Sequence, residues 1–185
     1  FFGFLLGTES PLTITQMLWV NLIMDTFAAG ALASLPPNER VMKDKPRRSG
    51  KDGDFIITRP MAYNIFGVGF AFVVILMGLL FYFHAQDGLT PHDLSWFFSF
   101  FVMLQFWNMF NAKAFMEGRS AFANLKDSKS FLLVALLILI GQYLIVTFGG
   151  EMFSVIPLSL RDWAIIIGSS SLVLWIGELF RLSKR

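Results

Sequence analysis

Five long apolar stretches limit what this chain can fold into more than any other feature. They are residues 12–35, 61–83, 94–112, 131–148 and 163–180. Together they contain only two charged residues, Asp25 and Glu178. A backbone inside a lipid bilayer must satisfy its own hydrogen bonds, and an α-helix does so within one segment. Each stretch is long enough for a helix to cross a hydrocarbon core of about 30 Å, the shortest with help from its flanking residues. The sequence therefore predicts five transmembrane helices.

Composition supports the same class of protein. Hydrophobic residues make up 55% of the chain and the mean hydropathy is +0.62, which excludes a soluble enzyme. The chain has no cysteine, so disulfides, thiolate metal sites and cysteine nucleophiles are excluded together. The opening residues 1–7 (FFGFLLG) follow no basic region and are expected to be the end of a further helix, not a signal peptide. The expected fold is an all-α membrane protein, a single polytopic helix bundle over residues 1–185 with five full spans plus the end of a sixth.

Basic residues are distributed very unevenly among the loops. All but one of the 15 Lys and Arg residues lie in the loop at 36–60, around the loop between the third and fourth stretches, or after the last stretch. The exception is Arg161. Because positively charged loops stay in the cytoplasm, these loops and the C-terminus are expected to be cytoplasmic. The first span then runs from outside to inside.

The net charge of +2 does not require a nucleic-acid partner. Topology and contact with anionic lipid headgroups account for the basic residues, so membrane lipid is the expected partner. The loop at 36–60 also contains four acidic residues and several prolines. It is either a solvated cytoplasmic connector or a docking surface.

Asp25 is the only ionisable residue of the first stretch and lies near its centre, four residues after Asn21. A carboxylate at bilayer depth costs at least ~2.5 kcal/mol, so it is tolerated mainly where it faces a bundle interior and has a function. Residues four apart share one face of a helix. A carboxylate and an amide oxygen suit hard cations such as Ca²⁺ or Mg²⁺. Asn21 and Asp25 are therefore candidate metal ligands; the alternative is that they form hydrogen bonds between helices.

Other polar residues in the apolar stretches are weaker candidates. Gln105 and Asn108 lie three apart on one helical face and could add amide oxygens to a cation site, although hydrogen bonding between helices is the simpler interpretation. Glu178 lies near a span end and can pair with Arg181 at i+3, which indicates a structural role. No catalytic residue is indicated.

Three segments carry a resemblance to a known family. The run PLTITQMLWVNLIMDTFAAGALASLPPNE closely resembles the sixth transmembrane helix of P-type Ca²⁺-ATPases. The run at 101–115 (FVMLQFWNMFNAKAF) resembles the eighth helix, and 148–163 (FGGEMFSVIPLSLRDW) the connection between the ninth and tenth. The resemblance covers nearly the whole chain and is closer to the plasma-membrane calcium pump than to the sarcoplasmic-reticulum pump. It implies that residues 1–7 end the fifth helix and that 36–60 is the cytoplasmic loop between the sixth and seventh.

The resemblance also implies ligands and a stoichiometry. The family motif places cation ligands at the asparagine and aspartate that match Asn21 and Asp25. Pumps of this family that have two calcium sites carry a threonine before this aspartate and a glutamate in the eighth helix. At these two positions this chain has Met24 and Gln105. A thioether is a poor ligand for Ca²⁺, and an amide is weaker than a carboxylate. The implied function is export of Ca²⁺ from the cytoplasm, one ion per cycle.

The family's D-K-T-G-T phosphorylation sequence is absent from these 185 residues, as are its nucleotide-binding domains. The chain alone is therefore expected to be inactive, and Mg²⁺ and ATP would act only in cytoplasmic domains outside it. The implied partners are the remaining helices and cytoplasmic domains of the same pump. The implied location is the plasma membrane, or the inner membrane if the source is bacterial, as a multi-pass protein with a cytoplasmic C-terminus.

Three alternatives remain open. Related pumps that move Na⁺, K⁺, H⁺ or Mn²⁺ use the same helix with altered ligands. A secondary cation transporter would also need a carboxylate inside the membrane, but such proteins commonly show internal repeats, and none is found here. The chain could also be a purely structural membrane module.

Overall fold

The computed structural model of the chain describes residues 11–35, 59–86, 89–117 and 119–183. The expected helix end at 1–7 and nearly all of the expected loop at 36–60 lie outside these residues. The described elements are α2 (Ile14–Leu18), η1 (Trp19–Met24), α3 (Asp25–Ala33), α4 (Arg59–His84), α5 (Pro91–Glu117), η3 (Leu125–Asp127), α6 (Lys129–Phe148), α7 (Gly150–Phe153) and α8 (Leu160–Ser183). No strand occurs among the described residues, so the all-α prediction is confirmed for them.

The longer helices extend beyond the apolar stretches. α4 begins at Arg59, so two residues assigned to the preceding loop belong to the helix. α5 and α8 extend past the expected spans at both ends. The reason is that hydropathy detects the lipid-embedded part of a helix, whereas a helix continues into polar flanking residues until a cap ends it.

Capping boxes fix three of the helix starts. In each, a hydroxyl residue before the helix and the residue three positions later exchange hydrogen bonds: Thr13 with Gln16, Thr90 with Asp93, and Ser159 with Asp162. This satisfies backbone N–H groups that the first turn of a helix leaves free. At α5 the first helical residue is Pro91, a position where the missing N–H of proline costs nothing.

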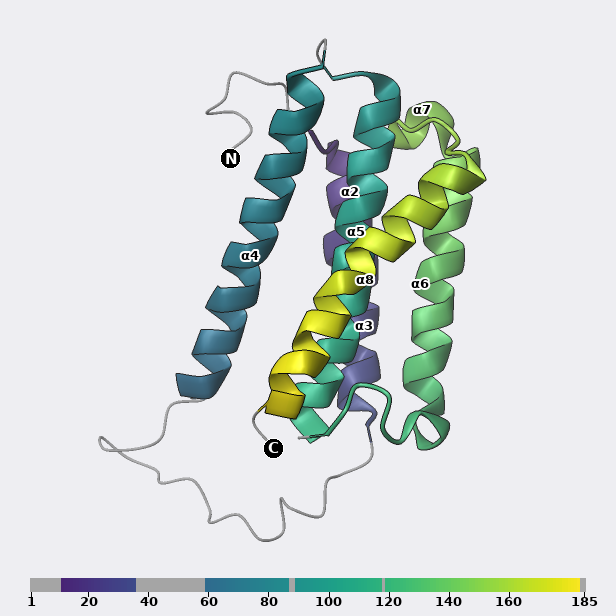
Figure 1. Ribbon diagram of the computed structural model, residues 1–185. Helices are drawn as coiled ribbons and strands as arrows, with labels where there is room; N and C mark the ends of the chain where they lie inside the picture. The colour runs from purple at the N-terminus through teal and green to yellow at the C-terminus, as the bar shows by residue number, and fades with distance from the viewer. Residues whose placement is uncertain (1–10, 36–58, 87–88, 118, 184–185) are drawn as a thin grey trace, which may run out of the picture.

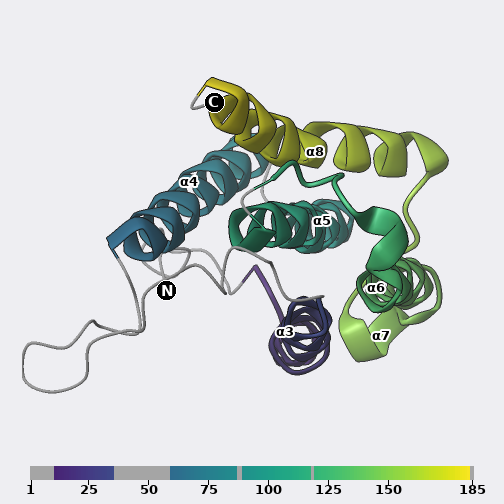
Figure 2. The ribbon, with the colours of Figure 1, turned by 90° about the horizontal axis from the view of Figure 1, so that it is seen from below.

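α5 is the central helix of the described bundle (Figures 1 and 2). It supplies much of the buried apolar core, including Phe98, Val102, Met103 and Leu104, each at most 1% exposed. α8 packs along it, and α3, α6 and α4 contact it on other sides. Because its neighbours surround it, α5 tolerates serines and amides that a lipid-facing helix would not.

α4, α6 and α8 are long and apolar enough to cross a membrane. α4 lies at the edge of the bundle and buries only Leu80 (Figure 1), so most of its surface is free to face lipid. The other two expected spans stay predictions. α5 carries many polar side chains inside the bundle, and the first span is divided into α2, η1 and α3.

Candidate cation site

The first span changes its helical type at the candidate site. Trp19–Met24 form a π-helix, η1, between α2 and α3. The backbone N–H of Asp25 donates to the carbonyl of Val20, five residues earlier, where an α-helix would use the residue four earlier. Asn21 thus lies within the π turn and Asp25 directly after it. Single π turns inside α-helices occur frequently at functional sites.

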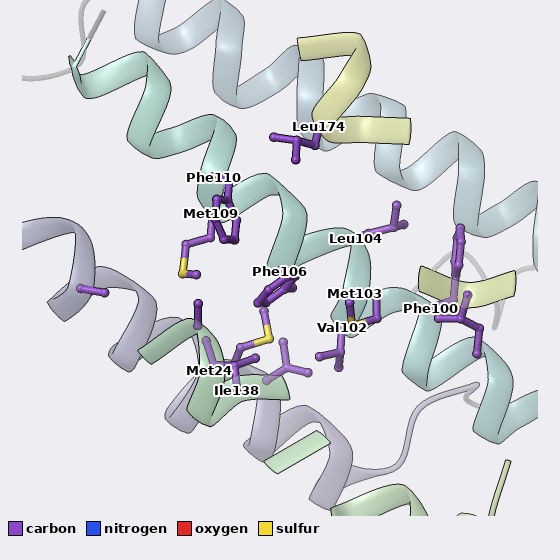
Figure 3. Packing of buried hydrophobic residues seen from close by; sticks show 14 of the residues in the cluster. Met24, Phe100, Val102, Met103, Leu104, Phe106, Met109, Phe110, Ile138 and Leu174 are labelled. Carbon is purple, nitrogen blue, oxygen red and sulfur yellow. The ribbon is translucent and has the colours of Figure 1, made fainter. Parts of the chain in front are cut away.

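The side chains of this segment divide into two groups. Val20 and Met24 are each 2% exposed and belong to the core cluster that also contains Ile138 of α6 (Figure 3). Asn21 and Asp25 are exposed on the bundle. Within the described part of the chain, neither forms a side-chain hydrogen bond or an ion pair. The alternative in which they bond to a neighbouring helix therefore gains no support from the described helices.

Gln105 and Asn108 are half-buried on α5. The residues around them face other helices: Phe106 lies in the core (Figure 3), and the indole N–H of Trp107 donates to Ser170 Oγ of α8 over 3.1 Å. Gln105 and Asn108 share another face of α5. No hydrogen bond within the described segments uses either amide or joins them to Asn21 and Asp25. They remain weaker candidate ligands.

The described residues do not form a complete calcium site. They contain no group of three or more His, Asp or Glu side chains that could hold a metal ion. Ca²⁺ takes 6 to 8 oxygen ligands, and Asn21 and Asp25 supply only part of that number. What these two residues can do is contribute one charged and one neutral ligand to a site completed by other oxygens.

A second polar cluster, which we call the polar clamp, consists of Asn111, Glu178 and Arg181 together with the backbone N–H of Ala121. Arg181 donates to Glu178 Oε1 over 2.8 Å and to Asn111 Oδ1 over 2.9 Å. Ala121 N–H donates to the same Glu178 oxygen over 2.6 Å, and Asn111 Nδ2 donates to a carbonyl of α8. The predicted Glu178–Arg181 pair is confirmed. The spacing of residues in the sequence does not predict that Asn111 joins this pair.

Comparison with known proteins agrees with this picture. The family described as "Cation transporting ATPase, C-terminus" matches residues 9–183. Plasma membrane calcium-transporting ATPase 1 of Homo sapiens is 35% identical over 192 residues, covering 97% of this chain. Plasma membrane calcium-transporting ATPase 4 of Homo sapiens is 36% identical over 95% of the chain, and plasma membrane calcium-transporting ATPase mca-1 of Caenorhabditis elegans 32% over 94%. The chain spans about 15% of the length of each of these relatives. It belongs to the cation-transporting P-type ATPase family, as a C-terminal membrane region of the plasma-membrane calcium pump type.

Proposed function

We propose that this chain is the C-terminal membrane part of an ATP-driven calcium pump and supplies Asn21 and Asp25 to its intramembrane Ca²⁺ site. The observation that carries the proposal is the division of side chains along η1. The apolar neighbours Val20 and Met24 are buried, whereas Asn21 and Asp25 are exposed and unpaired within the described bundle. An unpaired carboxylate at bilayer depth is costly unless it binds something. The similar proteins are calcium-transporting ATPases, which supports calcium as the ion.

The rest of the pump lies outside the chain in this proposal. Further oxygens come from other transmembrane helices, and ATP and Mg²⁺ bind cytoplasmic domains that phosphorylate the protein. Ca²⁺ leaves the cytoplasm across the plasma membrane. The chain contributes part of the site and its support, so on its own it has no ATPase activity.

The pump should carry one calcium ion per cycle. Met24 precedes Asp25 at the position where two-site pumps have threonine, and its side chain is buried in the core cluster (Figure 3). A buried thioether cannot act as an oxygen ligand for Ca²⁺. Gln105, which stands where a glutamate supports the second site, has no negative charge. In this proposal the pump therefore has ligands for only one calcium ion.

We expect the full-length pump to occlude one Ca²⁺ per phosphoenzyme. Equilibrium counting with labelled calcium, normalised to the amount of phosphoenzyme formed from ATP, measures this ratio directly. Two occluded ions per phosphorylated aspartate would contradict the inference that Met24 and Gln105 leave this pump without a second calcium site. A wild-type protein without calcium-dependent phosphorylation would contradict the proposed function itself.

The proposed orientation has its own support in the helix ends. α5 ends and α6 begins at the lower end of the bundle in Figure 1, where α8 also ends. Lys113, Lys129 and Arg181 belong to these three ends, whereas Arg161 belongs to the opposite end of α8. Lys113, Lys129 and Arg181 thus lie at one end of the bundle, which supports a cytoplasmic location of that end by the positive-inside rule.

We expect reporter tags inserted at Gly50 and after Arg185 to be cytoplasmic, and tags near Gly88 and at Gly149 to be external. Protease protection in sealed vesicles, or a compartment-specific enzyme tag, distinguishes the two sides. A cytoplasmic signal from the Gly88 insertion would overturn the orientation.

A further inference from the structure

The π turn needs a cause, because its own sequence supplies none. Helices are usually distorted at proline, at glycine and serine pairs, or where a side chain inserts into the hydrogen-bond ladder. The segment Trp19–Met24 reads WVNLIM and contains neither proline nor glycine. A π turn is rare and is not favoured by these residues alone. Contacts with the rest of the bundle must therefore hold it.

The most specific of these contacts is made by Trp19, the first residue of η1. Its indole N–H donates to the side-chain oxygen Oε1 of Gln142 on α6 over 3.0 Å. The ring lies directly on Gly141: a Cβ added there would lie 2.6 Å from Cη2 and 3.0 Å from Cζ2 of the indole. Gly141 thus makes room for the ring, and Gln142 fixes its orientation. We call Trp19, Gly141 and Gln142 the tryptophan latch.

The Gln142 side chain is specialised for this role. Gln142 is 1% exposed, and its Nε2 has no hydrogen-bond partner among the described residues. Burying an amide N–H₂ without a partner is costly, so a purely apolar contact with Trp19 would be better served by a leucine. What the amide gains here is the bond to the indole. The opposite assignment of the amide would place Nε2 against the indole N–H, donor against donor.

We propose that the tryptophan latch is a positioning device for the cation site, in which α6 holds the π turn so that Asn21 and Asp25 keep the orientation that binds calcium. This proposal rests on the proposed role of Asn21 and Asp25 as ligands. Trp19 precedes Asn21 by two residues on the same turn, and Met24 is buried in the core cluster that also contains Ile138 of the same helix α6 (Figure 3). Both ends of η1 are therefore fixed from the core side, and the ligands lie on the exposed side. A change at Trp19 rotates the ligands without touching them.

A steric test separates this role from general packing. In the full-length pump, Gly141→Ala should push the indole out of place and raise the calcium concentration for half-maximal ATPase activity roughly threefold to tenfold, which corresponds to the loss of about one hydrogen bond. Maximal activity at saturating calcium should be retained. In a Trp19→Phe background the indole atoms Cη2 and Cζ2, which would meet the new methyl group, are absent. Gly141→Ala should then cause no further shift.

The matched control is Trp107→Phe. It removes an indole hydrogen bond of nearly the same length, Trp107 Nε1 to Ser170 Oγ at 3.1 Å, but between α5 and α8. We expect no change in calcium affinity from it. Trp19→Phe and Gln142→Leu alone should weaken calcium binding as Gly141→Ala does, and they keep the test decisive if the alanine variant fails to fold.

Three results would overturn the proposal. One is an unchanged calcium affinity in Trp19→Phe and Gln142→Leu. Another is an equal shift by Gly141→Ala with and without Trp19. The third is a loss of maximal activity at unchanged calcium affinity, which would indicate a structural role only. Failure of the proposed function is recognised separately, since the wild-type pump would then show no calcium dependence at all.

Discussion

We expect the Asp25→Asn variant of the full-length pump to lose calcium-dependent phosphorylation from ATP. The substitution preserves the size of the side chain and leaves the helix intact, but it removes the negative charge that offsets the double charge of the ion. Asp25 is the only ionisable group of the first span, so no carboxylate on this helix can replace it. Its side chain has no partner among the described residues, so the change disrupts no packing or hydrogen bond there.

Phosphorylation from inorganic phosphate in the absence of calcium should survive in Asp25→Asn, because that reaction needs the site empty. This second measurement separates a lost ligand from a misfolded protein. Asn21→Ala should weaken the calcium dependence in the same direction but less, since a neutral amide contributes less to a hard cation than a carboxylate.

The control for Asp25→Asn is Glu178→Gln, the equivalent change at the other intramembrane acid. Glu178 is held in the polar clamp by Arg181 and by the Ala121 N–H, so it is not available as a ligand. Its glutamine variant should keep the apparent calcium affinity of the wild type. If Asp25→Asn transported calcium with wild-type affinity, the carboxylate would be structural and the site assignment wrong.

The parts of this fold that follow from local sequence could be predicted. Hydropathy located the long helices, because lipid exposure selects apolar residues directly, and the i+3 spacing of Glu178 and Arg181 predicted an ion pair that the structure contains. Asn21 and Asp25 are identified as candidate ligands because they are polar residues at i, i+4 spacing in an otherwise apolar stretch. In both cases the identity and spacing of residues along one helix are sufficient for the prediction.

The parts that depend on contacts between distant segments could not be predicted. Trp19 and Gln142 are 123 positions apart in sequence, and no periodicity relates them. The π turn at Trp19–Met24 has no signature in its own residues, so the expected α-helix over the whole first span missed it. The contacts of Trp19 with Gly141 and Gln142 of α6 lie far from this segment in sequence.

The split between Met24 and Asp25 illustrates the same limit. The resemblance indicated that Met24 lacks the chemistry of a ligand, but only the structure shows that it is buried in the core cluster (Figure 3). Adjacent residues on a helix differ in direction by about 100°. One position can therefore serve packing while its neighbour remains available to an ion.

The polar clamp leads to an expected result for stability, because it depends on a glycine. A Cβ added at Gly177 would overlap the side-chain amide of Asn111. Gly177→Ala should therefore displace Asn111 and break its bonds to the Val173 carbonyl and to Arg181. Losing these two bonds, one of them to a charged group, costs about 2 kcal/mol or more. Alanine returns about 1 kcal/mol through its higher helix propensity.

Gly168 provides the matched control on the same helix. A Cβ added there meets nothing within 4 Å, so Gly168→Ala should gain the helix propensity of alanine without a clash. The two substitutions are chemically identical but should differ in their effect on stability: Gly168→Ala should be neutral or stabilising, and Gly177→Ala should be destabilising by at least about 1 kcal/mol. The two variants are ranked by heating the full-length protein in detergent and measuring how much phosphorylation from inorganic phosphate each variant retains. Equal melting temperatures would mean that Asn111 moves aside at no cost and that the polar clamp does not hold α5 to α8.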